Sequence, residues 1–522
     1  MLILNICNFI NIISINFNKY FLISQIVFRG ISTILLWVKE IYVHNENKIN
    51  ARVTGTETEL KIIICRYKCD MNAGSMTLQA GSTIPLVETR FRDLESEYNP
   101  FEHRELTHPT SDTETFIHLL KGSLGSGILA MPLAIKNAGL ATGFISTLLV
   151  GAICTYCVHI LVKSATELCR RNQVPSLGFA ETAEMAFLTG RPGVRKYSRL
   201  AKALINLFLV IDLLGCCCVY IVFVGKNVKQ VVDHYSDSDL SIRVYMLLLL
   251  PFLIMMNMIR KLKFLSPFSM IANILIAVGV AITFYYILQD LPDMNTRPMF
   301  ASFGQLPLFF GTAIFALEGI GVVMPLENNM KTPHHFIGCP GVLNFGMSIV
   351  VGLYAFTGFL GYWKYGDETE GSITLNLPKD EILAQSVKIM IAVAIFLTYS
   401  LQFYVPMDII WKQVSHRFSD SKKNMMEYVL RITLIVGTVL MAVAIPNLGP
   451  FISLIGAVCL STLGLMFPAI IEMVTFWNEI ELVGFNNWNW RLYKNLLLVG
   501  FGIIGFLTGT YVSIEEITEE MI

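Results

Sequence analysis

Charged side chains are scarce in this sequence. Asp, Glu, Lys and Arg make up 15% of its 522 residues, against about 25% in a typical soluble domain. The formal net charge is +0, so there is no electrostatic reason to expect nucleic acid as a partner. No GxxxxGK[ST] motif occurs, which argues against ATP as an energy source, and no N-x-[ST] glycosylation sequon is present. No catalytic constellation or metal-ligand spacing stands out, so we expect neither an enzyme nor a cofactor.

What the sequence has instead is long apolar runs. Hydrophobic residues make up 54% of the chain, and runs near 20 residues recur from about residue 114 onwards. Helices of that length cross the roughly 30 Å of bilayer hydrocarbon, whereas barrel strands would show alternation over about 10 residues. We therefore predict an all-α membrane protein with eleven transmembrane helices. The predicted spans are 114–135, 142–164, 203–225, 244–259, 264–287, 304–326, 342–363, 384–409, 430–446, 450–474 and 495–513.

Three regions follow from these spans. Residues 1–112 are predicted to form a cytosolic, largely disordered extension, residues 113–513 the transmembrane domain, and residues 514–522 a short acidic tail. An apolar run at 20–38 carries Arg29 near its centre, which disfavours a further span.

Lys and Arg gather in alternate connecting segments, chiefly those after the second, fourth and eighth spans. Basic residues are enriched on the cytosolic side of membranes, so this bias places the N-terminus in the cytosol. The odd span count then places the acidic tail on the opposite side. The membrane is either the plasma membrane or a lysosomal or endosomal one, and the oligomeric state is not predicted.

The first and sixth spans share a pattern. The first contains GSGILAMP at 125–132 and the sixth contains GIGVVMP at 319–325. The two segments lie five spans apart and therefore enter the membrane from opposite sides. Such a pair of Gly/Pro-interrupted helices is typical of transporters built as inverted repeats, whose binding site lies between the breaks.

Broken helices in hydrocarbon leave backbone groups that need partners. A small zwitterion supplies them: its carboxylate accepts from amides near Gly125 to Gly127, and its ammonium meets carbonyls near Phe315, Ala316 and Glu318. The alternative is that these glycines only permit close helix packing, which we prefer for the GxxxG pair Gly505 and Gly509. The candidate substrate-binding residues are Ser123, Gly125, Ser126, Gly127, Phe315, Ala316, Glu318 and Gly319.

Several phrases together resemble the amino acid/auxin permease superfamily and, within it, the proton-coupled amino acid transporters. They are HLLKG (118–122), GSGILAMPLAIKNAG (125–139), LFFGTAIFALEGIGVVMPLENNMK (308–331), GSITLNLP (371–378) and LQFYVP (401–406). The resemblance covers about residues 113–513. It implies a five-plus-five inverted repeat with broken helices one and six and an extra eleventh helix. It also implies small neutral amino acids and protons as substrates. The extracellular cysteine pair of mammalian relatives is absent here, where residues 379–382 read KDEI.

The resemblance assigns proton coupling to His118, one turn before the first break. Histidine is the side chain that changes charge between about pH 5 and 8, although a histidine that merely hydrogen-bonds a neighbouring helix is the alternative. Glu318 is either a second proton site or a brace for exposed amides. Lys121 is interpreted as a gate residue or one that reaches the membrane interface.

Other function classes stay open at this point. A sodium-coupled amino acid transporter of the same superfamily differs only in the ion. A non-transporting amino acid sensor would bind substrate without flux. A receptor of the common class would have seven spans, and a channel does not need paired broken helices.

Overall fold

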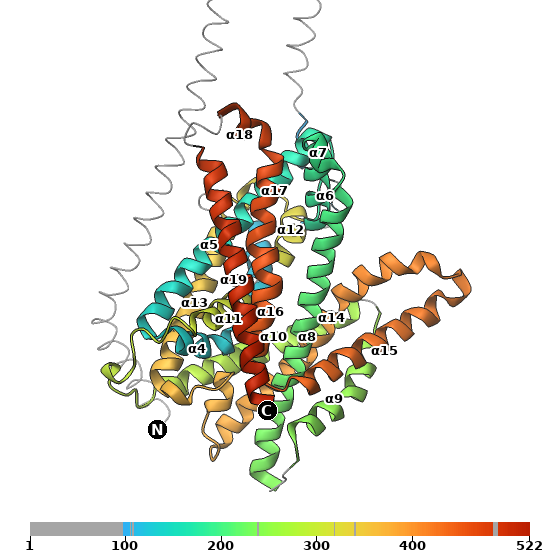
Figure 1. Cartoon of the computed structure of the whole chain (residues 1–522). Coiled ribbons are helices and arrows are strands. Elements are labelled where there is room, and N and C mark those ends of the chain that lie inside the picture. The colour runs from blue at the N-terminus through green and yellow to red at the C-terminus, as the bar shows by residue number, and fades with distance from the viewer. Residues whose placement is uncertain are drawn as a thin grey trace, which may run out of the picture. The chain divides into compact units, whose positions relative to one another are not determined.

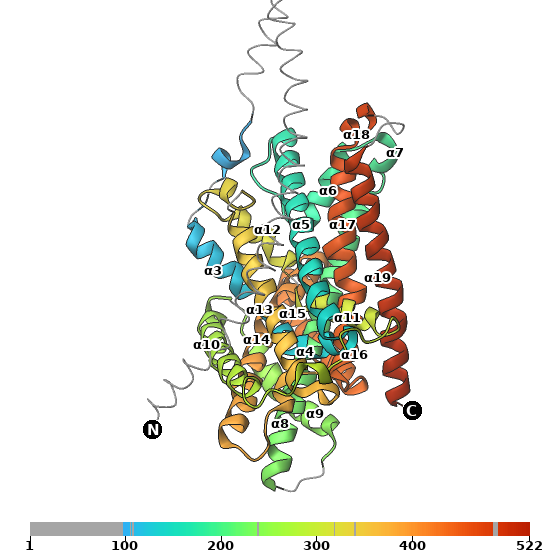
Figure 2. The ribbon, with the colours of Figure 1, turned by 90° about the vertical axis from the view of Figure 1, so that its left-hand side faces the viewer.

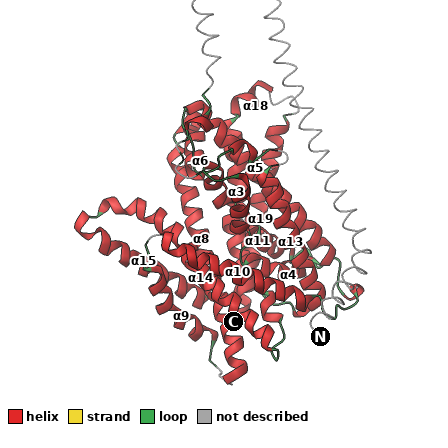
Figure 3. Ribbon diagram, turned by 180° about the vertical axis from the view of Figure 1, so that it is seen from behind, coloured by secondary structure: helices red, strands yellow, loops and turns green. Residues whose placement is uncertain are grey.

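A computed structural model describes residues 98–521, except 105, 107–108, 237–239, 261, 318, 339–340 and 484–488. Within these residues the regular structure is entirely helical, and the only β-type pairing is an isolated bridge between Thr110 and Met330 (Figure 3). The all-α prediction is confirmed for this part of the chain. Nearly all of the predicted extension, residues 1–97, lies outside the described residues, as does Glu318.

Helices occupy all the predicted spans (Figure 1). Within the described residues, nine are long and apolar enough to cross a membrane, and a tenth span is formed if the bent pair α3 and α4 counts as one. The predicted fourth span corresponds to α9, which has 16 residues and is shorter than a typical span. The count of eleven therefore stays a prediction. The main helices are α3 (Asp112–Ser123), α4 (Gly127–Ala138), α5 (Leu140–Asn172), α8 (Ser198–Ser236), α9 (Ile242–Asn257), α10 (Leu262–Ile287), α11 (Leu306–Ala316), α12 (Ile320–Asn328), α13 (Val342–Tyr365), α14 (Ile382–Val414), α15 (Asp420–Ala444), α16 (Leu448–Ile455), α17 (Phe467–Thr475) and α19 (Trp490–Met521). 

Short elements connect these helices. They are η1 (Pro100–His103), α6 (Phe179–Thr189), α7 (Pro192–Arg195), η2 (Met294–Thr296), η3 (Pro333–His335), η4 (Gly366–Glu368), η5 (Ile373–Asn376), η6 (Ser415–Arg417) and α18 (Trp477–Val483). One further element, η7 (Gly456–Met466), is π-helical and joins α16 to α17 inside the predicted tenth span.

The last helix is longer than predicted. The sequence places its end at residue 513 and a separate acidic tail at 514–522, whereas α19 continues to Met521. Hydropathy marks only the stretch that lies in hydrocarbon, and a helix that leaves the membrane continues in water if its residues are good helix formers. The Glu-rich end of α19 is of that kind.

The predicted packing role of Gly505 and Gly509 is confirmed. A Cβ atom at Gly505 would overlap the ring of Phe310 in α11, and one at Gly509 would lie 2.7 Å from Ala457 Cβ in η7. Small residues let helix backbones approach closely, which matters in a bilayer because lipid provides no hydrophobic driving force for helix association. This contact places α19 beside η7 and α11, and Figure 1 shows α19 running along α16 and α17.

Residues just before α3 pack against the helical unit rather than forming a tail up to residue 112. The backbone of Thr110 exchanges two hydrogen bonds with the chain after α12, to Asn329 (2.8 Å) and from Lys331 (2.9 Å). Arg104 bonds both the carbonyl and the carboxylate of Glu327 in α12. We call residues 98–111 the strap. It ties the start of α3 to the end of α12.

Candidate functional site

The first predicted break is present. Ser111 and Glu114 form a reciprocal capping box that starts α3, which fits the S-x-x-E pattern of a helix N-terminus. The helix ends at Ser123, and α4 begins at Gly127 in a direction turned by 56°. The interruption, residues 124–126, lies in the glycine-containing segment that the sequence pattern marks. What requires glycine here is the close approach of Gly127 to α11, where a Cβ atom would lie 2.6 Å from Ala316 Cα.

The sixth span is interrupted in the same way. Helix α11 ends at Ala316 and α12 begins at Ile320, with Gly319 at the N-cap of α12 (φ −159°, ψ −5°). Helices α11 and α12 together nevertheless form one candidate membrane span of 23 residues, whereas α3 and α4 form a bent pair. Glu318 falls in this interruption but lies outside the described residues.

The two interruptions lie against each other. A Cβ atom at Gly127 would lie 2.6 Å from Ala316 Cα, so the start of α4 touches the end of α11 backbone to backbone. A Cβ atom at Gly319 would lie 3.0 Å from Ser123 Oγ, so the end of α3 touches the start of α12. Figure 2 shows α3 beside α12. Segments almost 200 residues apart thus form one junction.

Four helix ends of alternating polarity therefore converge. The starts of α4 and α12 present amides without a helical acceptor, and the ends of α3 and α11 present carbonyls without a helical donor. Each start carries about half a positive charge and each end about half a negative one. The amides of Ile128 and Leu129 donate to the carbonyls of Gly125 (3.4 Å) and Ser126 (3.0 Å). The amides of Ser126 and Gly127 are then the ones at the very start of α4.

Burial of the candidate residues fits a site inside the protein. Ser123, Gly127, Phe315 and Ala316 are buried, and Gly125, Ser126 and Gly319 are half-buried. The Ser123 hydroxyl is buried and has no hydrogen-bond partner among the described residues. A buried hydroxyl without a partner costs free energy, so it is available to a ligand in the junction.

Tyr354 braces the first break, and sequence reasoning missed it. Its hydroxyl, carried by α13, donates to the Ser123 carbonyl (2.9 Å) and accepts from the Gly125 amide (3.2 Å). The side chain is fully buried. One hydroxyl therefore satisfies two backbone groups that the break releases. The sequence signal that could have indicated this role is a tyrosine in the middle of an apolar run, because a buried phenol hydroxyl needs a hydrogen-bond partner.

We expect Tyr354→Phe to raise the KM for substrate uptake about tenfold. The change leaves a buried carbonyl and a buried amide without their partner, at a cost of about 1–3 kcal/mol. Tyr362→Phe is the matched control, since Tyr362 is equally buried in the same helix and has no bond to either break. An unchanged KM for Tyr354→Phe, with Tyr362→Phe as reference, would show that the hydroxyl does not hold the break.

The structure does not bring His118 to the junction. His118 and Lys121 lie one turn apart on the exposed face of α3, while Thr115, Leu119 and Ser123 form its buried face. The buried face packs on α13, where Leu119 fills the space beside Gly346. His118 is therefore about five residues, or roughly 7.5 Å, along the helix from Ser123. Its role in proton coupling stays a prediction.

Comparison with known proteins identifies the family. Residues 108–515 match the family described as transmembrane amino acid transporter protein, which is most of the chain. The chain belongs to this family. A relative from Drosophila melanogaster, named proton-coupled amino acid transporter-like protein pathetic, is 42% identical over 444 residues, covering 84% of this chain and 93% of the relative. A relative from Caenorhabditis elegans, named probable amino acid transporter skat-1, is 26% identical over 415 residues, covering 78% and 90%.

Family membership confirms the resemblance drawn from the sequence phrases, and it makes the chain a multi-pass membrane protein of an amino acid transporter family. Two solved structures of Mhp1, a nucleobase-cation-symport-1 family transporter, also match. The inward-facing one has 12% identity and a TM-score of 0.46 over 78% of this chain and 93% of Mhp1. The closed one, with bromovinylhydantoin bound, has 14% identity and a TM-score of 0.46 over 81% and 94%.

Proposed function

We propose that this protein is a secondary active transporter that couples proton movement to the transport of small neutral amino acids. The observation that carries the proposal is the junction of four helix ends, where Gly127 meets Ala316 and Gly319 meets Ser123. A neutral α-amino acid is a zwitterion whose carboxylate and ammonium groups are attached to the same carbon atom. A site with helix starts and helix ends side by side complements both groups without any charged side chain.

Within this proposal five of the candidate residues contact the substrate. The substrate carboxylate accepts from the amides of Ser126 and Gly127 and from the free Ser123 hydroxyl. The ammonium donates to the carbonyls at the end of α11, those of Phe315 and Ala316. Among the described residues, those in contact across the junction are glycine, alanine and serine. Their close contacts favour a small, uncharged substrate side chain.

Protons provide sufficient driving force for this transport. One pH unit is worth about 1.4 kcal/mol, and one charge moving through about 60 mV adds roughly the same. Together they permit an accumulation of about a hundredfold for one proton per zwitterion. The transport cycle then carries net positive charge, which makes it measurable as a current.

We expect a small neutral amino acid to evoke an inward current that grows several-fold when external pH falls by one unit. The current should survive replacement of sodium by an inert cation. The measurement is voltage clamp on cells that express the chain, with uninjected cells as reference and glycine, alanine and proline as the first substrates. A strictly sodium-dependent current would indicate a sodium-coupled transporter. Substrate binding without tracer flux in proteoliposomes would indicate a sensor.

We expect His118→Ala to abolish the pH dependence of uptake while the chain still reaches the membrane. The reason is that histidine changes charge over the pH range in which the gradient operates, and His118 lies on the exposed face of α3 next to the break. His416→Ala is the control, because His416 is exposed in η6 and away from the breaks. If His118→Ala keeps the full pH response, proton coupling belongs to another group.

The topology completes the proposal. We propose eleven spans, with α9 as the fourth, arranged as two inverted sets of five plus α19. The N-terminus is placed in the cytosol by the Lys and Arg bias of the connecting segments. The membrane is the plasma membrane or that of lysosomes and endosomes.

A further inference from the structure

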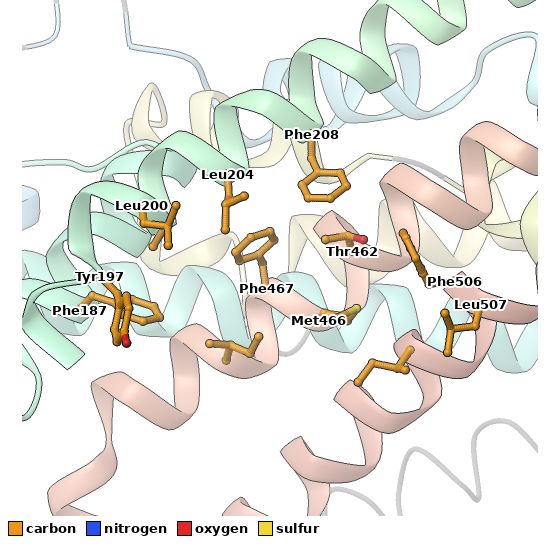
Figure 4. Close-up of a pocket in the computed structure, with 13 residues that line it drawn as sticks. Phe187, Tyr197, Leu200, Leu204, Phe208, Thr462, Met466, Phe467, Phe506 and Leu507 are labelled. Atoms are coloured by element: carbon orange, nitrogen blue, oxygen red, sulfur yellow. The ribbon is translucent and has the colours of Figure 1, made fainter. Parts of the chain in front are cut away.

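A groove outside the junction opens on the surface of the helical unit. It has a volume of about 530 Å³ and lies between α8 on one side and η7, α17 and α19 on the other (Figure 4). Leu204 and Phe208 of α8 face Met466 and Phe467 across it, and Leu507 of α19 lies at one edge. None of these residues belongs to the candidate substrate site. The groove is therefore a separate feature of the fold.

The lining is apolar almost throughout. Its two polar groups are the hydroxyls of Thr462 and Tyr197, and the Thr462 hydroxyl already donates to the Val458 carbonyl (2.8 Å). A zwitterionic amino acid would find no partners there and would lose its hydration. An alkyl chain, in contrast, has no polar groups to satisfy and needs only the apolar contact that this lining provides. The groove suits the apolar part of an amphiphile.

The length and the exposure of the groove fit one leaflet of a bilayer. The apolar lining on the α8 side runs from Leu200 to Phe208, which is about 12 Å at about 1.5 Å per residue. Half of the hydrocarbon thickness is about 15 Å. Leu200 and Leu507 are 52% and 60% exposed, and α8 and α19 are both long enough to span a membrane. The groove therefore opens sideways toward lipid.

Positive charge gathers at the Tyr197 end. Arg195, Lys196 and Arg199 are exposed and lie within two positions of Tyr197 in the chain, and Lys196 Nζ lies 4.9 Å from the centre of the Tyr197 ring. Neighbouring basic residues are already neutralised, as Arg191 pairs with Glu481 and Lys202 with Glu184. No such carboxylate partner is present for Lys196 or Arg199 among the described residues. Tyrosine beside basic residues is typical of the membrane interface.

We propose that this groove is a binding site for an anionic phospholipid. One acyl chain lies along α8 between Tyr197 and Phe208, and the headgroup lies at Lys196 and Arg199. Charge complementarity selects an anionic headgroup over a zwitterionic one, because each Lys or Arg near an anionic lipid strengthens binding by about fivefold. The cytosolic leaflet, where such lipids gather, is also the side to which the Lys and Arg bias assigns this end of α8.

The test measures lipid retained by the full chain. The protein is purified in detergent with added phosphatidylserine or phosphatidylcholine, and bound lipid is counted by native mass spectrometry. We expect one phosphatidylserine per chain, retained at least about tenfold better than phosphatidylcholine. Lys196→Gln with Arg199→Gln should weaken phosphatidylserine binding roughly 30-fold, since two basic residues are lost, and leave phosphatidylcholine unchanged. Leu204→Trp should remove both lipids by filling the groove.

Matched variants separate the groove from general effects. Lys422→Gln removes an exposed charge elsewhere, and Leu248→Trp adds bulk to an exposed position on α9. Both should bind lipid as the unaltered chain does, and all variants should keep its melting temperature. Equal phosphatidylserine binding by Leu204→Trp or by the double charge variant would overturn the proposal. So would pairing of two copies in lipid nanodiscs that Leu204→Trp abolishes, because the groove would then hold protein.

Discussion

Gly127→Ala is expected to reduce amino acid uptake at least about tenfold while surface expression persists. The added Cβ would lie 2.6 Å from Ala316 Cα, and the nearest atom belongs to backbone that cannot rotate away. Overpacking of this kind costs about 1–3 kcal/mol and is relieved only by moving helices apart. Here the helices that must separate are α4 and α11, whose ends define the junction. Tracer uptake into cells, normalised to surface protein, measures the loss.

Gly125→Ala provides the matched control two residues away. A Cβ atom there meets nothing within 4 Å, and the amide that bonds Tyr354 is retained. Uptake should stay within about twofold of the unaltered chain. If both alanine variants lose activity equally, the glycines are needed for backbone flexibility and the close contact of α4 with α11 is not the cause. If neither loses activity, the junction is not the transport site.

The breaks and helices were predictable because their causes are local. Apolar runs mark the membrane-crossing stretches, and glycine with a following Met-Pro marks where helix geometry ends. Seven of the site residues are described, and the contacts of Gly127 with Ala316 and of Gly319 with Ser123 bring the two predicted segments together. The prediction needed only the pattern and its repetition in the sixth span.

Helix ends and helix type were less predictable. Helix α8 extends from Ser198 to Ser236, well beyond the predicted 203–225, because polar residues continue a helix outside hydrocarbon where hydropathy gives no signal. The π-helical geometry of η7 could not be predicted from the sequence either. Its residues have the same apolar composition as an α-helix, and the wider geometry is a property of how neighbouring helices pack.

Side-chain hydrogen bonds and ion pairs between distant residues could not be predicted. The bond of Tyr354 to Ser123 joins residues 231 positions apart, and that of Arg104 to Glu327 joins residues 223 positions apart. A single sequence without its packing contains no signal for such pairs. The second pair anchors the strap to α12 through Arg104, while the disorder of the extension as a whole stays a prediction.

Arg104→Ala is expected to lower the free energy of unfolding by about 3–5 kcal/mol, because it leaves the Glu327 carboxylate buried and without its ion-pair partner. The two side chains are 5% and 3% exposed, with Nη2 to Oε1 at 3.1 Å. Arg104 also donates to the carbonyls of Glu327 and Pro175, both at 3.0 Å. The midpoint of thermal unfolding of the purified chain in detergent measures the loss. Uptake should fall as well, since Glu327 lies in α12, which forms part of the junction.

Two further variants separate the buried charge from the simple loss of contacts. Arg191→Ala breaks a pair whose side chains are 47% and 53% exposed, and such surface pairs contribute only about 0–1 kcal/mol. Arg104→Met combined with Glu327→Leu removes both charges and should recover much of the stability, because burying an unpaired charge is the costly step. A double variant as unstable as Arg104→Ala would mean that the carbonyl bonds of Arg104, and not its ion pair, hold the strap on α12. In that case we expect uptake to depend more on the backbone hydrogen bonds of Thr110 with Asn329 and Lys331 than on the Glu327 carboxylate.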